Sequence, residues 1–438
     1  MKFFRVPFLM PLGLLAGIST PLHAEVQYQQ KPKSIEQLGN VAVVNEKLEK
    51  IRVGFDFALR FQSLEHKNNG MKAVGADFQP DTADDVALSK LKPGFTNAVG
   101  NFNLTFNLAS GVSSYVEAYL SSEHHLEMWM REGYLFIDHF EGTSFEGLNA
   151  MMEYLSFKIG QMEINYGDAH FRRTDNGEAF RNAFIGNYII DPNTTEIAIE
   201  TMLDVKDFEW MLGVSGGTTK GDNKDGHGIA LYSKLAYDTQ VTESSRFRLS
   251  GSYYQVDHSD NGPSAYPSFD GTKNYLYAGN RSGSPYAFLF DVSTDAGQIL
   301  PNASQDLSAY MINALFQWQG TEVFLNYDMV RDADPDGSNS PAENEEAWDQ
   351  RAIDIKQMLN SNTYLALRYN EAHHLKAAGQ NSDELVTRQQ VALGHYLTDS
   401  SVLKLEYVKQ EYKNFASVGD LRSGGEFSGF IMEGAVHF

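Results

Sequence analysis

Twelve residues near the beginning of the chain alternate between the two faces of an extended strand without interruption. In IRVGFDFALRFQ, residues 51 to 62, every odd-numbered residue is large and apolar, and every even-numbered residue is polar or small. Side chains of a strand point to opposite faces at each step, so this segment has one apolar and one polar face. Strands of soluble proteins average about five or six residues, whereas a tilted strand that crosses a membrane needs about nine to eleven. The length of the pattern therefore favours a strand that crosses a membrane.

The same alternation recurs in residues 99 to 108, 246 to 254, 321 to 329 and 402 to 408. A sheet with two such different faces belongs either to a soluble sandwich with its apolar faces buried together, or to a membrane barrel with a polar interior. The chain ends in GFIMEGAVHF, which places on one face Phe430, Met432, Val436 and the terminal Phe438. An apolar edge strand at a terminus would promote aggregation of a soluble protein. This terminal strand instead resembles the sorting signal of outer-membrane barrel proteins.

Sixteen segments carry the pattern of a strand. They are residues 51 to 62, 99 to 110, 112 to 121, 130 to 139, 151 to 163, 195 to 202, 207 to 215, 228 to 238, 246 to 256, 308 to 319, 321 to 330, 349 to 359, 363 to 371, 387 to 397, 402 to 411 and 427 to 438. An even number is expected when both ends of a closed barrel lie in the periplasm. Residues 284 to 292 could hide a further pair and raise the number to eighteen. We therefore expect an all-β fold, a closed antiparallel transmembrane β-barrel of about 16 strands with short periplasmic turns and long extracellular loops.

The first 24 residues precede this pattern and have the features of a secretory signal. Two basic residues, Lys2 and Arg5, are followed by a short apolar stretch that two prolines interrupt. We expect cleavage of this signal peptide near Ala24, which exports the rest of the chain. We expect residues 25 to 50 to be an N-terminal periplasmic segment, with a partial plug or a disordered leader as alternatives, and residues 51 to 438 to form the barrel.

The composition and one motif bear on the class of function. The chain has no cysteine, which excludes disulfides, thiolate metal sites and a catalytic thiol. The formal net charge of -22 argues against nucleic-acid binding, because phosphate contacts need clustered lysine and arginine. Residues 213 to 217, GVSGG, match the motif around the serine nucleophile of some hydrolases, which needs a strand, a sharp turn and a helix. Here Ser215 precedes a loop rich in glycine, aspartate and lysine, so we expect no enzyme.

Over its whole length the chain resembles the porins of Gram-negative bacteria, including the general diffusion and phosphate-selective porins. The resemblance rests on the signal peptide, the alternating strands, the succession of short turns and long loops, and the C-terminal Phe438. It implies an outer-membrane, water-filled channel for passive diffusion of small hydrophilic solutes and ions, because sixteen tilted strands enclose an aqueous interior. It also implies a homotrimer in contact with outer-membrane lipid and lipopolysaccharide. The alternatives are a channel specific for an anion, such as phosphate or an acidic sugar, and a non-conducting adhesin or assembly barrel.

The third long loop, residues 167 to 194, combines charged and apolar residues. In porins the third extracellular loop commonly folds into the barrel and narrows it. A loop this apolar should pack against another surface, and we expect the inner wall, with the extracellular rim or a subunit interface as alternatives. Charges that face each other across a narrow pore would filter solutes, and in the anion-specific alternative the arginines would select the anion. The residues predicted at the constriction are Asp168, His170, Arg172, Arg173, Asp175, Glu178 and Arg181.

Inward-facing strand positions carry charges of both signs, so neither sign is expected to dominate the pore wall. The predicted wall residues are Arg52, Asp56, Arg60, Glu117, Lys158, Arg248, Arg368 and Lys404. The net charge of the chain does not settle the selectivity, because much of it belongs to outer loops that solutes pass without contact.

Residues 332 to 343, DADPDGSNSPAE, match the template of a calcium-binding loop. The oxygen ligands would come from Asp332, Asp334, Asp336 and Glu343, because Ca²⁺ prefers carboxylate and carbonyl oxygens around a tight glycine turn. The flanking segments have the pattern of strands rather than helices, and two prolines stiffen the loop. Structural calcium and a solvated acidic loop are therefore both open, and we expect no other cofactor.

Overall fold

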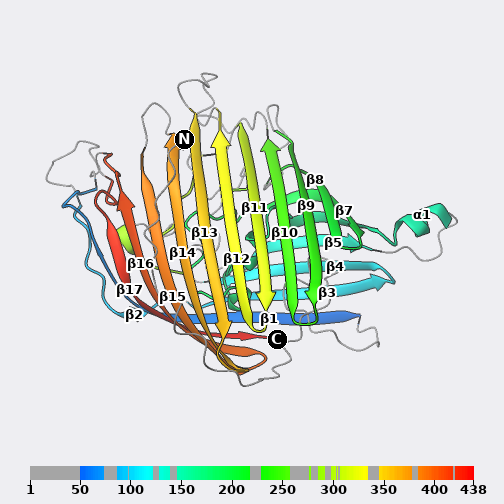
Figure 1. Ribbon diagram of the computed structural model, residues 1–438, viewed down its shortest axis with the longest axis horizontal. Helices are drawn as coiled ribbons and strands as arrows, with labels where there is room; N and C mark the ends of the chain where they lie inside the picture. The colour runs from blue at the N-terminus through cyan, green and yellow to red at the C-terminus, as the bar shows by residue number, and fades with distance from the viewer. Residues whose placement is uncertain are drawn as a thin grey trace.

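The computed structural model describes residues 50–73, 86–96, 98–121, 128–138, 146–217, 228–256, 276–277, 285–291, 297–301, 303, 306–333, 345–376, 383–417 and 420–438. These residues form one closed antiparallel β-barrel (Figure 1). Strands β10 to β13 stand upright at the front of Figure 1, whereas β1 and β3 to β5 cross behind them at a steep angle. The predicted signal peptide and residues 25–49 lie outside the described residues.

Sixteen strands make the wall of the barrel, as predicted. They are β1 (Ile51–Lys67), β3 (Val99–Ala109), β4 (Val112–Ser121), β5 (Trp129–Ile137), β6 (Leu155–Glu163), β7 (Thr195–Val205), β8 (Phe208–Ser215), β9 (Ala230–Thr242), β10 (Ser245–Val256), β11 (Leu307–Trp318), β12 (Thr321–Asp332), β13 (Glu346–Met358), β14 (Thr363–Lys376), β15 (Leu385–Thr398), β16 (Ser401–Lys413) and β17 (Glu426–His437). A two-residue strand, β2 (Gly94–Phe95), pairs with β1 in addition. No helix among the described residues is long and apolar enough to cross a bilayer.

The first strand closes the barrel. Strand β1 pairs with β17 from Asp56 opposite His437 to Lys67 opposite Glu426, and its first half pairs with β3. The terminal residue adds to this seam, because Phe438 and Phe55 exchange backbone hydrogen bonds of 3.1 and 2.9 Å. Closure leaves the apolar C-terminal strand without a free edge, which removes the tendency to aggregate that such an edge would have.

Two details of the prediction are wrong. Residues 151 to 154 are not strand: residues Glu146–Met151 form the short helix α1, and β6 begins at Leu155. The ladder with β7 ends at Leu155 opposite Leu203, and only the Tyr154 carbonyl accepts one more hydrogen bond, 2.9 Å from the Asp204 N–H, before β7 ends at Val205. The eighteen-strand alternative also fails, because the described residues 285–291 contain bends and the single 3-10 turn η4 (Leu289–Asp291). Phe288 and Phe290 have φ of 61° and 52°, which no strand accommodates.

The two faces of the wall meet different surroundings. Along β1, Val53 is 57% exposed and Leu59 is 38% exposed on the outer face, whereas Ala58 and Arg60 on the inner face are buried. The same alternation of exposed apolar and buried polar or small residues follows β7 to β17. An outer face made of isoleucine, leucine, phenylalanine and tryptophan is the lipid-facing band of a transmembrane barrel.

The lipid-facing band predicts a stability difference that depends on depth. Leu235→Arg, near the middle of β9 on its outer face, is expected to lower the free energy of unfolding by about 2–4 kcal/mol, because it places a charge at the bilayer midplane. Val241→Arg, near the turn at the end of the same strand, is the matched control and should lower it by about 0–1 kcal/mol. Guanidinium unfolding in lipid vesicles measures both. Equal losses for the two variants would contradict the assigned membrane depth.

Candidate functional site

The connection between β6 and β7 crosses the interior of the barrel. We call residues 164–194 the inner loop; it contains two single 3-10 turns, η2 (His170–Arg172) and η3 (Ala179–Arg181). All of its residues are buried except Arg172, Phe180, Arg181 and Ala183, which are partly exposed. Solvent therefore reaches the inner loop along one limited side, and the rest of it is packed.

The beginning of the inner loop is held by two cations of the β9–β10 wall. The Asp168 carboxylate lies 2.5 Å from Lys234 Nζ and 2.8 Å from Arg248 Nε, and it accepts a 2.7 Å hydrogen bond from Ser250. Its backbone N–H donates to Asn313 on β11 at 2.7 Å. Burial would raise the pKa of Asp168, but Lys234 and Arg248 outweigh it and hold the pKa well below its ordinary range. Asp168 is therefore ionised at neutral pH and anchors the loop.

The middle of the inner loop contacts a buried arginine on β5. Arg131 is 2% exposed. Its guanidinium lies 3.0 Å from Glu163 and 3.4 Å from Glu117, and its Nε contacts the Asp175 carboxylate of the loop. Tyr119 donates a 2.5 Å hydrogen bond to the same Asp175. The β4–β6 wall thus binds the loop by charged hydrogen bonds, which are stronger than neutral ones.

Carboxylates outnumber arginines in this buried network. Its carboxylates belong to Glu117, Glu132, Glu163, Asp175, Glu178 and Asp191, and its arginines are Arg131, Arg173 and Arg181. Arg181 lies 3.1 Å from Glu163 and 2.6 Å from Glu178, and His170 Nε2 lies 3.1 Å from Glu163. Burial raises the pKa of Glu178 well above its ordinary value; Arg181 opposes this rise and the Glu117 carboxylate adds to it.

The last part of the inner loop is stacked on an arginine of β14. Arg368 makes a two-point ion pair with Asp354 on β13, with both N–O distances at 2.7 Å. Its guanidinium carbon lies 4.2 Å from the ring centres of both Phe184 and Tyr188. The Tyr188 hydroxyl donates to Asp354 at 2.8 Å. Cation–π contact and hydrogen bonding therefore fix these two aromatic residues of the loop together.

The third side of the lumen binds the backbone of the loop. Lys404 on β16 donates to the Ala179 carbonyl at 2.5 Å and lies 3.1 Å from Glu433 on β17. Arg60 on β1 donates to the Asn176 carbonyl at 3.0 Å and lies 2.7 Å from the same Glu433. These contacts, with those to β5, β10 and β14, show that the loop spans the lumen from wall to wall.

The exposed side of the inner loop faces the end of the barrel that carries the short turns. Arg172 pairs with Glu322, the second residue of β12, and its guanidinium carbon lies 4.4 Å from the Phe324 ring. The Phe180 ring lies 6.2 Å from the ring of Tyr396 and 5.8 Å from that of His437, both near strand ends at the short turns. In outer-membrane barrels this end is periplasmic. The two partly exposed arginines of the loop, Arg172 and Arg181, therefore lie on its solvent-accessible side.

Residues of the β10–β11 connection cover the other side of the inner loop. The Ile299 N–H donates to the Ile189 carbonyl at 2.8 Å. Arg388 on β15 joins the two segments, because it donates to the carbonyl of Asn187 at 2.6 Å and to that of Gly297. At the depth of the inner loop, the inner loop and the described residues of the β10–β11 connection therefore both pack into the lumen.

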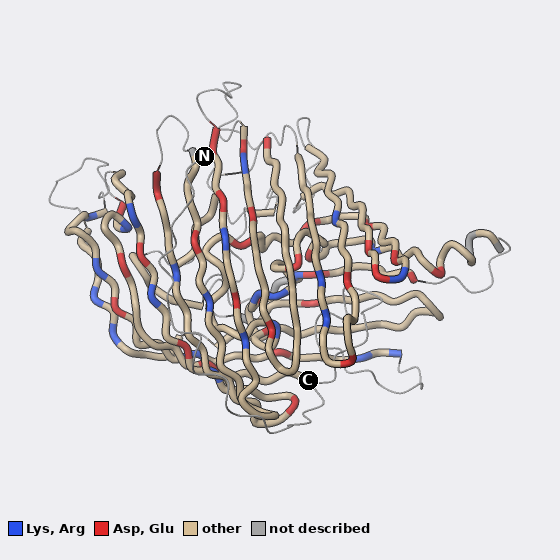
Figure 2. The backbone as a smooth tube through the Cα atoms, viewed as in Figure 1, with Lys and Arg blue, Asp and Glu red and all other residues tan. Residues whose placement is uncertain are grey.

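The eight predicted wall residues lie at inner-face positions of their strands. Figure 2 shows that charged residues of both signs occur along the strands. Arg60, Arg248, Arg368 and Lys404 contact the inner loop as described above. Glu117 joins the Arg131 network, and Lys158 lies 4.0 Å from the Tyr134 ring centre. Asp56 pairs with His437 at 2.6 Å, and Arg52 is partly exposed.

Glycine allows the inner loop to approach β1 closely. A Cβ atom at Gly177 would lie 2.7 Å from the carbonyl oxygen of Asp56 and 3.0 Å from the Cα of Gly100. Any other residue would therefore push the loop away from the wall at this point. Asn101 supports the contact, because its side-chain oxygen accepts a 2.8 Å hydrogen bond from the Gly177 N–H.

Sequence reasoning missed Arg131 and Lys234. In β5 the alternation breaks, because the register shifts at Glu117 and Ala118 and both Arg131 and Glu132 become buried. Two adjacent charges within an apolar strand were the available signal of such a bulge. Lys234 had a clearer signal, since alternation in β9 places it on the inner face.

The calcium-loop prediction falls mostly outside the described residues. Asp334, Asp336 and Glu343 are among those not described, so calcium binding stays a prediction. Asp332 is buried at the end of β12 and accepts a 3.1 Å hydrogen bond from the Asp306 N–H. Within the described ranges, no three histidine or carboxylate side chains are arranged to hold a metal ion.

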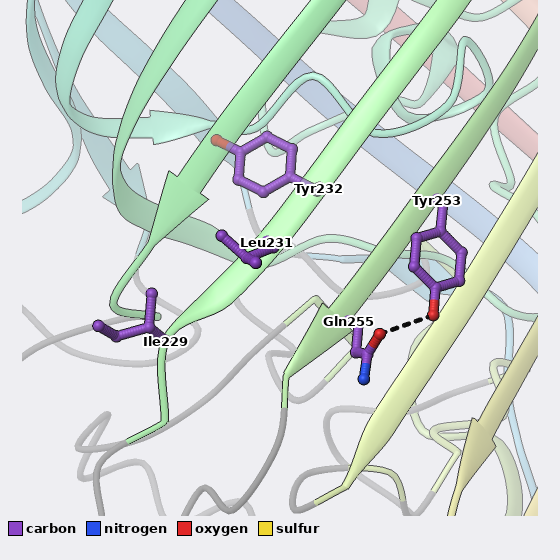
Figure 3. Close-up of a pocket in the computed structure, with 5 residues that line it drawn as sticks. All are labelled: Ile229, Leu231, Tyr232, Tyr253 and Gln255. Carbon is purple, nitrogen blue, oxygen red and sulfur yellow. Dashed lines mark hydrogen bonds between the residues drawn. The ribbon is translucent and has the colours of Figure 1, made fainter.

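Two other features lie apart from the inner loop. The Ser215 hydroxyl donates to Glu196 at 2.5 Å and accepts from the Gly217 N–H at 2.8 Å, which leaves it without a histidine base among its hydrogen-bond partners in the described structure. A hollow of ≈ 290 Å³ lies near the long-loop ends of β9 and β10. Figure 3 shows the five residues that line it. Its lining includes Leu231 and Tyr253, which lie on the outer face of the wall, so the hollow is not part of the lumen.

Comparison with known proteins finds likeness in structure only. The sequence matches no family model and no curated protein sequence. OprB of Pseudomonas putida, solved at high pH, superimposes with a TM-score of 0.51 at 9% identity, over 89% of this chain and 94% of that one. This chain has a porin-like fold.

Two further channel structures support the same conclusion. The anion-selective porin of Comamonas acidovorans superimposes with a TM-score of 0.50 at 9% identity, over 89% of this chain and 99% of that one. The outer-membrane channel DcaP of Acinetobacter baumannii gives 0.50 at 12% identity, over 89% and 97%. At these identities the likeness extends to the porin-like fold and not to the solute.

Proposed function

We propose that the protein is an outer-membrane channel for passive diffusion of small hydrophilic solutes and ions, in which the inner loop is the constriction. The porin-like fold supports the channel class. The proposal depends on the inner loop, which contacts opposite walls of the lumen. Its Asp168 pairs with the β10 wall, its middle contacts Arg131 on β5, and its last part stacks on Arg368 of β14. A segment held in that way sets the cross-section available to solutes.

The predicted constriction residues divide into two groups under this proposal. Arg172 and Arg181 are partly exposed, so they are the residues that solutes would contact. Asp168, Arg173, Asp175, Glu178 and His170 are buried, and they would position the loop rather than meet solutes.

The anion-specific alternative is less well supported. Arg172 pairs with Glu322, Arg173 with Asp191, and Arg181 with Glu178. A paired arginine has fewer donors to offer an anion. The second candidate is a non-conducting barrel, which the packing of the β10–β11 connection onto the inner loop favours.

Planar lipid bilayers test the proposal directly. The full chain is expected to give discrete ohmic conductance steps, with a small reversal potential in a salt gradient because charges of both signs line the pore. Block of the current by phosphate or an acidic sugar would support the anion-specific channel instead. An absence of steps, for protein whose folding is verified by its mobility shift on heating, would support the non-conducting barrel.

We further propose that the mature protein resides in the outer membrane of a Gram-negative bacterium, after signal-peptide cleavage near Ala24, as a homotrimer. The lipid-facing band and the porin-like fold support this location. We assign the protein no catalytic role. Sedimentation in detergent of matched density measures the oligomer, and N-terminal sequencing of membrane-extracted protein measures the cleavage site.

A further inference from the structure

One described part of the β10–β11 connection, residues 285–291, lies against the long-loop half of β1. The side chain of Gln62 and the backbone of Ala287 exchange two hydrogen bonds, each of 2.9 Å. The Tyr286 hydroxyl donates to Glu406 on β16 at 2.6 Å. The segment ends in the turn η4, which is attached to β1 separately, through a histidine.

Both ring nitrogens of that histidine, His66, contact backbone groups of fixed polarity. Its Nδ1 lies 3.0 Å from the Phe290 N–H, which can only donate, so Nδ1 must accept. Its Nε2 lies 2.6 Å from the Ser89 carbonyl oxygen, which can only accept, so Nε2 must carry a proton. The two contacts together require a neutral imidazole with its proton on Nε2.

A second proton on His66 would break its contact with η4. An imidazolium donates from both nitrogens, so two N–H groups would face each other across 3.0 Å. The turn itself is strained, because Phe288 and Phe290 have φ of 61° and 52°. Residues other than glycine persist in that region only where their surroundings hold them there. Without the contact to His66, the turn would therefore relax away from β1.

The other described histidines accommodate a second proton. His374 lies between two carboxylates, with Nε2 2.6 Å from Glu346 and Nδ1 2.7 Å from Glu384. A carboxylate within ion-pair distance also accompanies His170, His373 and His437. The partner of His395 is the Thr363 hydroxyl, which can either donate or accept. Among the described residues, none of the carboxylates lies within ion-pair distance of His66, so its contacts suit the neutral form alone.

The elements packed around His66 present uncharged groups to it. Phe427 is opposite His66 on β17, and the Phe290 ring lies 5.3 Å from the His66 ring and 5.2 Å from that of Tyr412 on β16. The charged residues of these strand ends are at outward positions; they are Glu65, Lys67, Lys409, Glu411, Lys413 and Glu426. Lys90, next to Ser89, is exposed, and Arg422 pairs with Asp420.

We propose that His66 is an acid-sensitive switch, whose neutral form holds η4 against β1 and whose protonation releases the turn. Histidine is the side chain that ordinarily changes charge between pH 5 and pH 8, and His66 is partly exposed, so solvent protons reach it. The released turn belongs to the connection that covers the inner loop. Acid therefore loosens the packing on that side of the lumen. The proposal goes beyond the channel function and does not need the barrel to conduct.

Electron paramagnetic resonance of a nitroxide at residue 288 tests the proposal on the full chain in lipid vesicles. The chain has no cysteine, so Phe288→Cys creates a single labelling site, and Phe288 is 60% exposed. We expect the rotational correlation time of the label to fall several-fold from pH 8 to pH 5, because the turn is freed. A label at Ser361→Cys, in the short turn between β13 and β14, should not change.

Two amide variants of His66 are matched to each other. His66→Asn places an amide oxygen near the position of Nδ1, so the label at residue 288 should stay immobile at both pH values. His66→Gln places an amide nitrogen near the position of Nε2 and offers Phe290 no acceptor at Nδ1, so the label should be mobile at both. His395→Gln should keep the acid response. The mobility shift on heating verifies that each variant is folded.

Any of three results would overturn the proposal. Equal correlation times at pH 8 and pH 5 with His66 present would mean that protonation does not release the turn. A full acid response in His66→Asn would assign the response to another group, such as the Glu406 carboxylate that binds Tyr286. A label in His66→Gln as immobile at pH 8 as with His66 would mean that the Nδ1 contact does not hold the turn.

Discussion

Replacing the whole inner loop by a two-residue turn is expected to raise the single-channel conductance several-fold. Glu163 and Thr195 are directly opposite each other at the ends of β6 and β7, so Asn-Gly in place of residues 164–194 can close the hairpin. The ladder between the two strands stays intact. The variant would remove a segment that spans the lumen from β5 to β14 and leave water in its place, and conductance rises with the open cross-section.

This variant is expected to fold although it leaves charged side chains of the wall without their loop partners. Arg131, Lys234 and Arg368 lose loop contacts, but water that enters the emptied lumen can solvate them. The mobility shift on heating verifies that the barrel is folded, and bilayer recordings of both proteins at the same salt concentration measure the effect. An unchanged conductance would mean that the inner loop does not limit the flow of ions. An absence of conductance steps for both proteins would favour the non-conducting barrel.

Most of the wall was predictable because its signal is local. A lipid-facing strand must alternate over about ten residues, and each strand carries that pattern independently of its partners. The exceptions depend on partners distant in sequence. Strand β6 begins at Leu155, close to the end of its partner β7 at Val205, and no property of residues 151 to 154 reveals that limit.

The sequence predicted which residues face the interior of the barrel, but not which of them pair with each other. Alternation predicted Arg248 and Arg368 on the inner face, and the mixture of apolar and charged residues predicted a packed third loop. That Arg248 binds Asp168, 80 residues earlier, follows from the course of the loop through the lumen. The Arg131 network depends on a bulge in β5, which shifts two adjacent charges inward against the period of two.

Two carboxylates of the inner loop are expected to respond in opposite ways to replacement by an amide. Asp168→Asn removes the counter-charge of Lys234 and Arg248, both of which are buried. Breaking a buried pair from one side costs about 3–5 kcal/mol, because the remaining charges lose their partner. Glu178→Gln removes a carboxyl whose ionised form is already disfavoured by burial and by Glu117, so stability at pH 7 should be unchanged or slightly higher.

The free-energy differences between the wild type and each of the two variants depend on pH in opposite directions. The folded-state pKa of Asp168 lies well below its ordinary value, so its contribution is present above about pH 4 and is lost as pH falls through the folded pKa. The gap between wild type and Asp168→Asn should therefore narrow in acid. The folded-state pKa of Glu178 is raised, so its contribution is complete below about pH 4 and is lost as pH rises through the folded pKa.

Guanidinium unfolding in lipid vesicles at about pH 2, pH 4 and pH 7 measures these free-energy differences, because the Asp168 contribution is lost below about pH 4 and that of Glu178 above it. Glu178→Gln serves as the matched control for Asp168→Asn. Both changes replace one carboxylate of the same loop by an amide of nearly equal size. The contrast between them therefore isolates the cation partners from the effect of altering the loop. If both variants lost the same free energy at pH 7, the ion pairs of Asp168 would not anchor the inner loop to the β9–β10 wall.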